Sequence, residues 1–378
     1  MKNCMTNIAA ASALVCVIVG CEPSDGAKDL DLGRKAYEVH DLKKAEKHFM
    51  ECVALDPGNA DALIYLARVK LDAEEVAAAR DWIDKAVQVA GDDVDVKLVA
   101  AQVAWHEKNY DKAAAGFASV ANDTKLSPQL CAQGWTGLGV VEMARERHHL
   151  ARIAFLRAIR LNRRDAAAWY HLGLVYRDAF GYYEAALEQF EIFVRLEASA
   201  SPRVQKTSRA VIPTLKEQIA REAANRPGVS KRDSAACATA LAKAEAAWKK
   251  GNFRNARDAY QTALSADPLS YPAAIGLAKA WAKTDNTKTG QAKAFENYKL
   301  ACSLRPGAIS TFLTTGELAA RLGYNAQAVE IFSRAVAASP TSLQAIDGLI
   351  RALQRTGKHK ADAHAYQLYR ESIPLKRK

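Results

Sequence analysis

The sequence predicts an all-α protein built from repeated helix pairs, and two observations support this. Alanines recur every 34 residues at Ala45, Ala79 and Ala113, and each is followed four and seven residues later by further apolar side chains, which places the three on one helix face. Hydrophobic residues make up 49% and charged residues 25% of the 378-residue chain, with only 11 prolines. This composition excludes a disordered, collagen-like or polytopic membrane protein and permits long helices.

Residues 1–20 predict a signal peptide. Lys2 precedes an apolar run, Ile8 to Val19, that is shorter than the roughly 20 residues needed to span a bilayer. The run ends in Ile-Val-Gly-Cys21, which resembles the bacterial lipobox and implies lipidation of Cys21. Acyl chains contribute about 0.8 kcal/mol per buried methylene, so two or three of them give a stable anchor. Glu22, in place of the aspartate of the inner-membrane retention signal, favours the outer membrane. An ordinary signal peptide is the alternative.

The alanine-centred triplet returns along most of the chain. In most copies a small residue, a large one and a smaller one share a face, as two closely packed helices require. The copies are Ala45/Phe49/Cys52, Ala79/Ile83/Ala86, Ala113/Phe117/Val120, Ala151/Phe155/Ala158, Ala186/Phe190/Phe193, Ala256/Tyr260/Ala263, Ala294/Tyr298/Ala301 and Ala328/Phe332/Ala335, with a degraded one at Tyr366 and Tyr369. About twelve residues before each alanine, a small residue such as Gly33 marks a first helix, where we expect the neighbouring backbone to approach. Turn residues such as His40 and Gly251 separate the helices.

The repeats fall into two groups separated by a break. Residues 21–200 hold about five repeats, with extra residues before the fourth copy and one extra residue before Ala186 in the fifth. Residues 201–232 predict a bridging helix and linker, in which Pro213 would kink or restart the helix. Residues 233–378 hold about four repeats, with an insertion at 286–291.

These residues resemble the tetratricopeptide repeat family. The resemblance rests on Ala166-Ala-Ala-Trp-Tyr-His-Leu-Gly173, on Gly251-Asn-Phe followed by Ala256, Tyr260, Ala263 and Asp267-Pro268, and on the 34-residue period. It implies a right-handed α-solenoid of two arrays joined by a bridging helix, with a concave face lined by first helices. The groove residues that it implies are Arg34, Tyr37, Arg68, Trp105, Tyr170 and Arg177 in the first array and Trp248, Lys249, Lys279, Lys283, Arg321, Arg351 and Arg355 in the second.

The net charge of +11 is distributed unevenly along the chain. Residues 201–378 hold 29 basic and 13 acidic side chains, a net charge of +16, whereas residues 1–200 have a net charge of −5. The basic part predicts contact with an anionic partner. Ordinary drift in solvated surface charge is the alternative interpretation.

No motif in the sequence indicates catalysis, a metal site or a cofactor. Gly137-Leu-Gly139 lacks the third glycine of a dinucleotide loop, and His148-His149 stands at an inter-helix turn. Asp92-Asp-Val-Asp95 lacks the residues of a calcium loop and is expected to cap a helix that begins near Val94. Of seven cysteines, Cys52, Cys131, Cys237 and Cys302 are expected to be small hydrophobes, although a Cys131–Cys237 bridge is possible in an oxidising compartment.

The sequence therefore predicts a non-enzymatic scaffold, lipid-anchored in the bacterial envelope and facing the periplasm. It would bind segments of partner proteins in its groove and require no cofactor. The resemblance to the family includes lipoproteins that assist pilus or secretin assembly and adaptors of peptidoglycan enzymes, between which the residues do not decide. The alternative is that the basic second array binds an anionic non-protein ligand such as lipopolysaccharide, anionic lipid or acidic polysaccharide. Nucleic acid is not expected as a partner of an exported chain.

Overall fold

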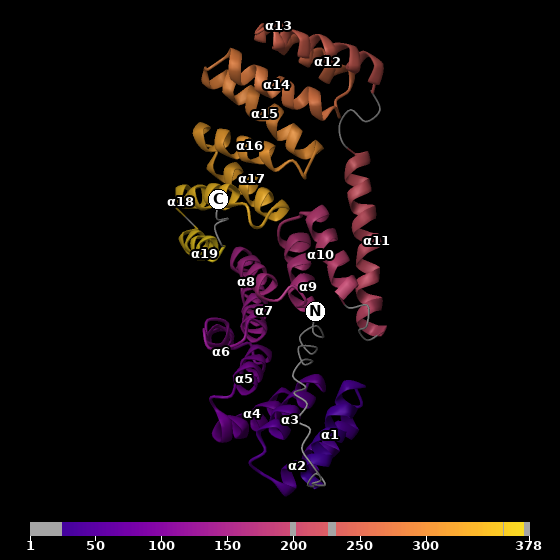
Figure 1. The fold of residues 1–378 in the computed structure, drawn as a ribbon, viewed down its shortest axis with the longest axis vertical. Helices are drawn as coiled ribbons and strands as arrows, with labels where there is room; N and C mark the ends of the chain where they lie inside the picture. The colour runs from indigo at the N-terminus through magenta and orange to yellow at the C-terminus, as the bar shows by residue number, and fades with distance from the viewer. Residues whose placement is uncertain (1–24, 197–201, 226–231, 358, 374–378) are drawn as a thin grey trace, which may run out of the picture. The chain divides into compact units, whose positions relative to one another are not determined.

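The fold was analysed in a computed structural model that describes residues 25–196, 202–225, 232–357 and 359–373. Within these ranges every regular element is helical, so the all-α prediction is confirmed (Figure 1). Among the described residues, no helix combines the length and apolar character needed to cross a membrane. The predicted signal peptide and Cys21 lie outside the described residues.

Most helices form antiparallel pairs that follow one another along the chain. The first five pairs are α1 (Asp25–Glu38) with α2 (Leu42–Leu55), α3 (Ala60–Asp72) with α4 (Val76–Ala90), α5 (Val94–His106) with α6 (Tyr110–Ala121), α7 (Pro128–Ala144) with α8 (His148–Leu161), and α9 (Ala166–Leu174) with α10 (Tyr183–Leu196). A single long helix follows, α11 (Pro202–Ala224). The last four pairs are α12 (Ser234–Lys249) with α13 (Phe253–Ala266), α14 (Tyr271–Thr284) with α15 (Lys288–Leu304), α16 (Ile309–Leu322) with α17 (Asn325–Ala338), and α18 (Leu343–Thr356) with α19 (Lys360–Glu371).

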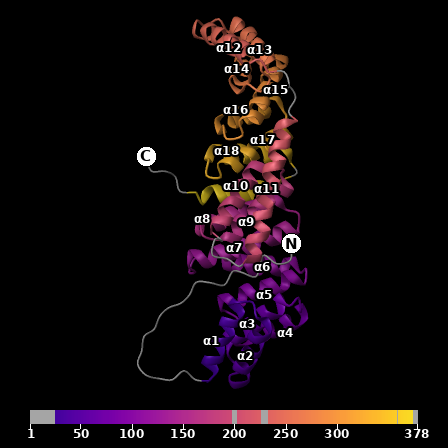
Figure 2. The same cartoon turned by 90° about the vertical axis from the view of Figure 1, so that its right-hand side faces the viewer.

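The chain divides into two compact units. The first comprises residues 1–175 and 189–200, and the second comprises residues 176–188 and 201–378. Helices α1–α9 therefore belong to the first unit and α12–α19 to the second. Within the second unit the helix pairs stack in chain order (Figure 2). We call α1–α10 the first array and α12–α19 the second array.

The core of each array is built from the alanine-centred triplets. Ala45, Phe49 and Cys52 are completely buried, and the corresponding residues of the later copies are buried in the same way. Gly33 and Gly139 of the first helices each face an aromatic ring, because an added Cβ would lie 2.5 Å from Cε1 of Phe49 and 2.5 Å from Cε1 of Phe155, respectively. At Gly33 the expectation of an approaching backbone was therefore wrong: space is needed there for a side chain of the second helix.

The turns between helices follow the sequence signals in most pairs. His40, Lys108 and four glycines adopt positive φ at the ends of first helices, as the turn residues predicted. Glu74 and Glu146 adopt the same conformation without any turn signal in the sequence. Asp93 caps α5 by accepting hydrogen bonds from the backbone of Asp95 and Val96, which confirms the predicted cap.

Two irregularities in the sequence have clear structural outcomes. The extra residue before Ala186 coincides with a π-helical segment, η1 (Val175–Ala179), because a one-residue insertion in a helix is absorbed as a wider turn. Helix α11 continues through Pro213. The expectation that the proline would restart the helix is therefore wrong. The hydroxyl of Thr214 donates a hydrogen bond to the carbonyl of Ala210 in that region, at 3.1 Å.

Candidate functional site: the inner face of the first helices

The first helices form the inner layer of the stack. In the first unit α1 contacts α3, α3 contacts α5, α5 contacts α7 and α7 contacts α9, and in the second unit α16 contacts α18. The second helices α2, α4, α6, α8, α13, α15 and α17 each pack between the first helices of their own pair and of the next pair. In a curved stack the layer whose members approach one another lies on the concave side. The first helices therefore line the candidate groove in the first array and at α16 and α18, and the equivalence of the repeats extends this surface to α12 and α14.

In the first array, two predicted groove arginines are held by carboxylates of the next pair. Nη2 of Arg34 lies 2.7 Å from Oδ2 of Asp61, and Nη2 of Arg68 lies 3.1 Å from Oδ1 of Asp95. Both aspartates are the second residue of the following first helix, α3 or α5. These partners were not predicted from the sequence, although the repeated 27-residue separation would have revealed them.

Tyr37 is also engaged within the first array. Its ring meets the ring of Tyr65 edge to face, with the centroids 5.7 Å apart, and the negative charge of Asp72 acts on its hydroxyl. Burial raises the pKa of the Tyr37 hydroxyl and also that of the Asp72 carboxyl. Tyr37 therefore serves as a packing residue between α1 and α3.

The other aromatic candidates of this array are packed as well. Trp105 lies against the core formed by α5 and α6, and its indole Nε1 is buried without a hydrogen-bond partner among the described residues. Tyr170 meets the ring of Phe190 edge to face, with the centroids 5.6 Å apart. Arg177 lies on η1, where its Nε is 2.6 Å from Oδ1 of Asp178.

The second array presents its cations differently. Lys249 and Lys279 are exposed and form no ion pair with any described residue. Trp248 is half-buried against Phe253, with the ring centroids 4.9 Å apart. Nζ of Lys283 lies 5.7 Å from the centroid of the Phe253 ring and has no carboxylate partner among the described residues.

The remaining candidates continue this pattern along the array. Arg321 and Arg351 are exposed, and neither is paired with a carboxylate within the part of the chain that the structure describes. Arg355 of α18 donates from Nη1 to the backbone carbonyl of Ala320 on α16, at 3.2 Å. This contact places Arg355 beside the last turn of the preceding first helix, which also carries Arg321.

One repeat position distinguishes the two arrays. Each of the four first helices of the second array has a cation in its last turn. We call these four residues the last-turn ladder: Lys249, Lys283, Arg321 and Arg355. At the corresponding position, the last residue of α1, α3, α5 and α7, the first array has Glu38, Asp72, His106 and Ala144. The structure thus assigns part of the charge asymmetry to a single line of side chains.

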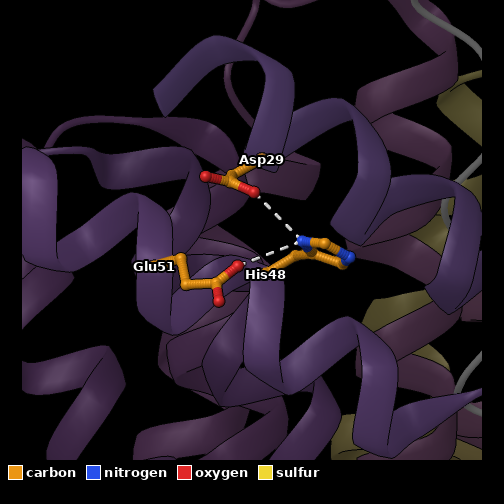
Figure 3. A group of neighbouring side chains, drawn as sticks. All are labelled: Asp29, His48 and Glu51. Atoms are coloured by element: carbon orange, nitrogen blue, oxygen red, sulfur yellow. Dashed lines mark hydrogen bonds and ion pairs between the residues drawn. The ribbon is translucent and has the colours of Figure 1, made fainter. Parts of the chain in front are cut away.

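A cluster at the start of the first array was not marked by any sequence motif. Nδ1 of His48 lies 3.0 Å from Oδ1 of Asp29 and 3.2 Å from Oε2 of Glu51 (Figure 3). Asp29 comes from α1 and the other two come from α2. An imidazole and two carboxylates are ligand types that zinc accepts. The same contacts also suit a His48 imidazole that hydrogen-bonds a carboxylate without any metal, and its contact with Asp29 links α1 and α2.

The remaining residues singled out in the sequence are structural. Cys52, Cys131, Cys237 and Cys302 are buried free thiols, as expected of cysteines that pack as small hydrophobes. Burial raises the pKa of Cys302 to about 11, which makes its thiolate form rare at neutral pH. Gly137 and Gly139 lie on α7 against the rings of Phe117 and Phe155, as helix packing requires.

Comparisons with known proteins place the chain among repeat proteins. A family model described as tetratricopeptide repeat matches residues 36–103, and a second of the same description matches residues 136–201 and 241–303. Together the matches cover more than half of the chain. No curated protein matches it.

Several solved structures are similar to the chain. The structure titled Functional Characterization of Pseudomonas aeruginosa pilF is 15% identical, with a TM-score of 0.40, and the match covers 69% of this chain and 98% of that one. The structure of PilW, titled a type IV pilus biogenesis factor, is 13% identical, with a TM-score of 0.41 and coverage of 67% and 98%. MamA from Desulfovibrio magneticus RS-1 is 15% identical, with a TM-score of 0.37 and coverage of 48% and 99%.

Proposed function

Because the chain belongs to the tetratricopeptide repeat family, we propose that it is a non-enzymatic scaffold that binds segments of partner proteins along its first helices. The observation that carries this proposal is the inner layer of the second array, where exposed cations stand in register and have no carboxylate partners among the described residues. Side chains that are unpaired within a protein are available to a partner. In the first array the corresponding surface is occupied by its own ion pairs.

The same proposal includes a site of action. A lipid at Cys21 would hold the scaffold at a membrane of the bacterial envelope, facing the periplasm, with the outer membrane favoured by Glu22. This part rests on the lipobox resemblance alone. A Cys21→Ala variant tests it, because the variant should lose incorporation of labelled palmitate and move from the membrane fraction to the soluble fraction. Identical fractionation of the variant and the unaltered chain would contradict the anchor.

Site-specific photo-crosslinking tests the scaffold role. A photoreactive amino acid at Lys279, on a first helix, should give adducts with envelope proteins in detergent-solubilised membranes. The same amino acid at Lys288, an exposed residue at the start of the second helix α15, is the matched control and should give few. Equal adducts at both positions, or none at Lys279, would count against binding on the inner face. If adducts form at Lys279, the identity of the captured protein would distinguish three candidate roles: pilus assembly, secretion and adaptation of peptidoglycan enzymes.

A further inference from the structure

The last-turn ladder is a regular feature of the second array. Its members occupy equivalent places in α12, α14, α16 and α18, each is exposed, and none forms an ion pair with another described residue. A cation in the last turn of a helix gains up to about 1 kcal/mol from the helix dipole, so stability alone gives it some value. That explanation does not distinguish the arrays, since α1 and α3 end in Glu38 and Asp72.

Acidic residues of the same helices leave the ladder uncompensated. Glu245 on α12 and Glu317 on α16 stand four residues before Lys249 and Arg321 and form no ion pair with them. Asp347 on α18 is committed to Arg370 of α19. In the first array Lys70, a cation in the last turn of α3, is instead paired, because its Nζ lies 2.7 Å from a carboxylate oxygen of Glu46 and 2.9 Å from one of Glu75.

The spacing of the ladder sets the form of a ligand. Packed helices lie about 8–10 Å apart, so Arg321 and Arg355 recur at about that interval, because their helices α16 and α18 are in contact. A polyproline II segment advances about 9 Å per turn of three residues and presents every third side chain on one face. An acidic residue at every third position would therefore meet successive members of the ladder.

Apolar surface beside the ladder favours a polypeptide over a bare polyanion. Trp248 is only half-buried and stands next to Lys249, and the ring of Phe253 lies beneath Nζ of Lys283. Aromatic faces next to cations suit the mixed surface of a peptide, in which prolines or aliphatic residues alternate with carboxylates. We propose that the last-turn ladder binds an extended acidic segment of a partner protein, with carboxylates about three residues apart. This deepens the proposed scaffold function and rests on it.

A designed peptide tests the inference with the full chain. The probe is a fluorescein-labelled peptide of about six Glu-Pro-Pro repeats, and its matched control has glutamine in place of glutamate. Fluorescence anisotropy should show binding of the glutamate peptide at low salt and loss of most of it near 0.5 M salt, where charges are screened beyond about 4 Å. A peptide with glutamate at every fifth position should bind several-fold more weakly.

Variants of equal charge separate the ladder from the general basic field. Lys283→Glu/Arg321→Glu removes two members of the ladder. It should lower the affinity for the glutamate peptide by about tenfold or more, because two exposed ion pairs are replaced by repulsion. Arg254→Glu/Lys288→Glu makes the same change in net charge at exposed residues of the second helices α13 and α15 and should weaken it less than about threefold. Lys283→Gln/Arg321→Gln is the milder version if the reversal variant does not fold.

Four results would overturn the inference. The first is equal affinity for the glutamate and glutamine peptides, and the second is an equal loss of peptide affinity in the ladder and control variants. The third is binding of heparin or anionic vesicles that depends on the ladder, without binding of the peptide. The fourth is self-association that depends on the ladder, measured by sedimentation. Adducts at Lys279 in the crosslinking experiment would still support the scaffold in each of these cases, so the two proposals fail separately. Adducts that disappear in the ladder variant, together with peptide binding, would support both.

Discussion

The two arrays use the same helix packing but treat the cations of their first helices in opposite ways. In the first array Arg68 of α3 pairs with Asp95, the second residue of α5. In the second array Lys279 of α14 is followed by α16, whose second residue is Ser310, and Lys279 forms no ion pair with a described residue. Whether a groove cation is available to a partner therefore depends on the first turn of the next repeat. Recognition can be added or removed without altering the fold.

Substitutions in the packing that the two arrays share should have the largest effect on the free energy of unfolding. A Cβ on Gly139 of α7 would lie 2.5 Å from the ring of Phe155, and one on Gly316 of α16 would lie 2.7 Å from the ring of Phe332. Gly139→Val and Gly316→Val should each lower the free energy of unfolding by about 3 kcal/mol, because both rings are buried and the added side chain would overpack the core. Urea unfolding monitored by circular dichroism measures this.

A glycine in open space is the control for these two variants. A Cβ added to Gly307 would have no atom within 4 Å, so Gly307→Ala should change the free energy of unfolding by less than about 0.5 kcal/mol. A loss confined to one of the two valine variants would show that the arrays do not share the same packing.

Local patterns were sufficient to predict the helices and their cores. The 34-residue spacing of small and aromatic residues located the buried triplets, and Asp93 was recognisable as a cap from its position before an apolar run. The π-helical segment was visible only as one extra residue, because a helix can absorb an insertion in several ways.

The candidate site was harder to predict because it depends on neighbouring repeats. Arg34 and Lys279 are equivalent in sequence pattern, but the second residue of the following first helix is Asp61 in one case and Ser310 in the other. The contact of His48 with Asp29 likewise joins two helices and has no local signature. Residues within one helix follow a period, whereas pairs between helices require the packing to be known.

The second prediction concerns pH and applies to the first array alone. His171 is buried, its ring is stacked on that of Phe155, and its Nδ1 has no hydrogen-bond partner within the part of the chain that the structure describes. Burial lowers the pKa of His171 to about 4, from 6.5 in the unfolded chain. Between these values the unfolded state binds more protons, so stability falls as the pH falls through this window. The loss from pH 7 to pH 5 should be about 2 kcal/mol.

His171→Phe isolates this contribution because it keeps an aromatic ring against Phe155. Urea unfolding of both proteins at pH 7 and pH 5 should show a larger acid-induced loss for the unaltered chain. The described histidines of the second array, His359 and His364, are not buried, so the effect has no counterpart there. Equal losses in the two proteins would mean that His171 is charged in the folded state.

The third prediction compares one paired and one unpaired cation. Arg68→Gln removes a side chain that is 15% exposed and bonded to Asp95, and it should lower the free energy of unfolding by about 0.5–1 kcal/mol. Lys279→Gln at the matching position of the second array should change it by less than about 0.5 kcal/mol. Added salt should reduce the difference between the two variants. An equal cost for both would contradict the distinction between paired and available cations.

The smallest expected effect comes from transferring the first-array pairing into the second. Ser310→Asp places a carboxylate where Asp61 and Asp95 stand in their helices and should stabilise the chain by a few tenths of a kcal/mol. Part of this gain would arise from an acid in the first turn of α16, since it faces the positive end of the helix dipole. The double-mutant cycle with Lys279→Gln removes that part, because only the coupling between residues 279 and 310 remains. A coupling of zero would mean that the register of the next repeat does not control the cation, and the charge difference between the arrays would then need another cause.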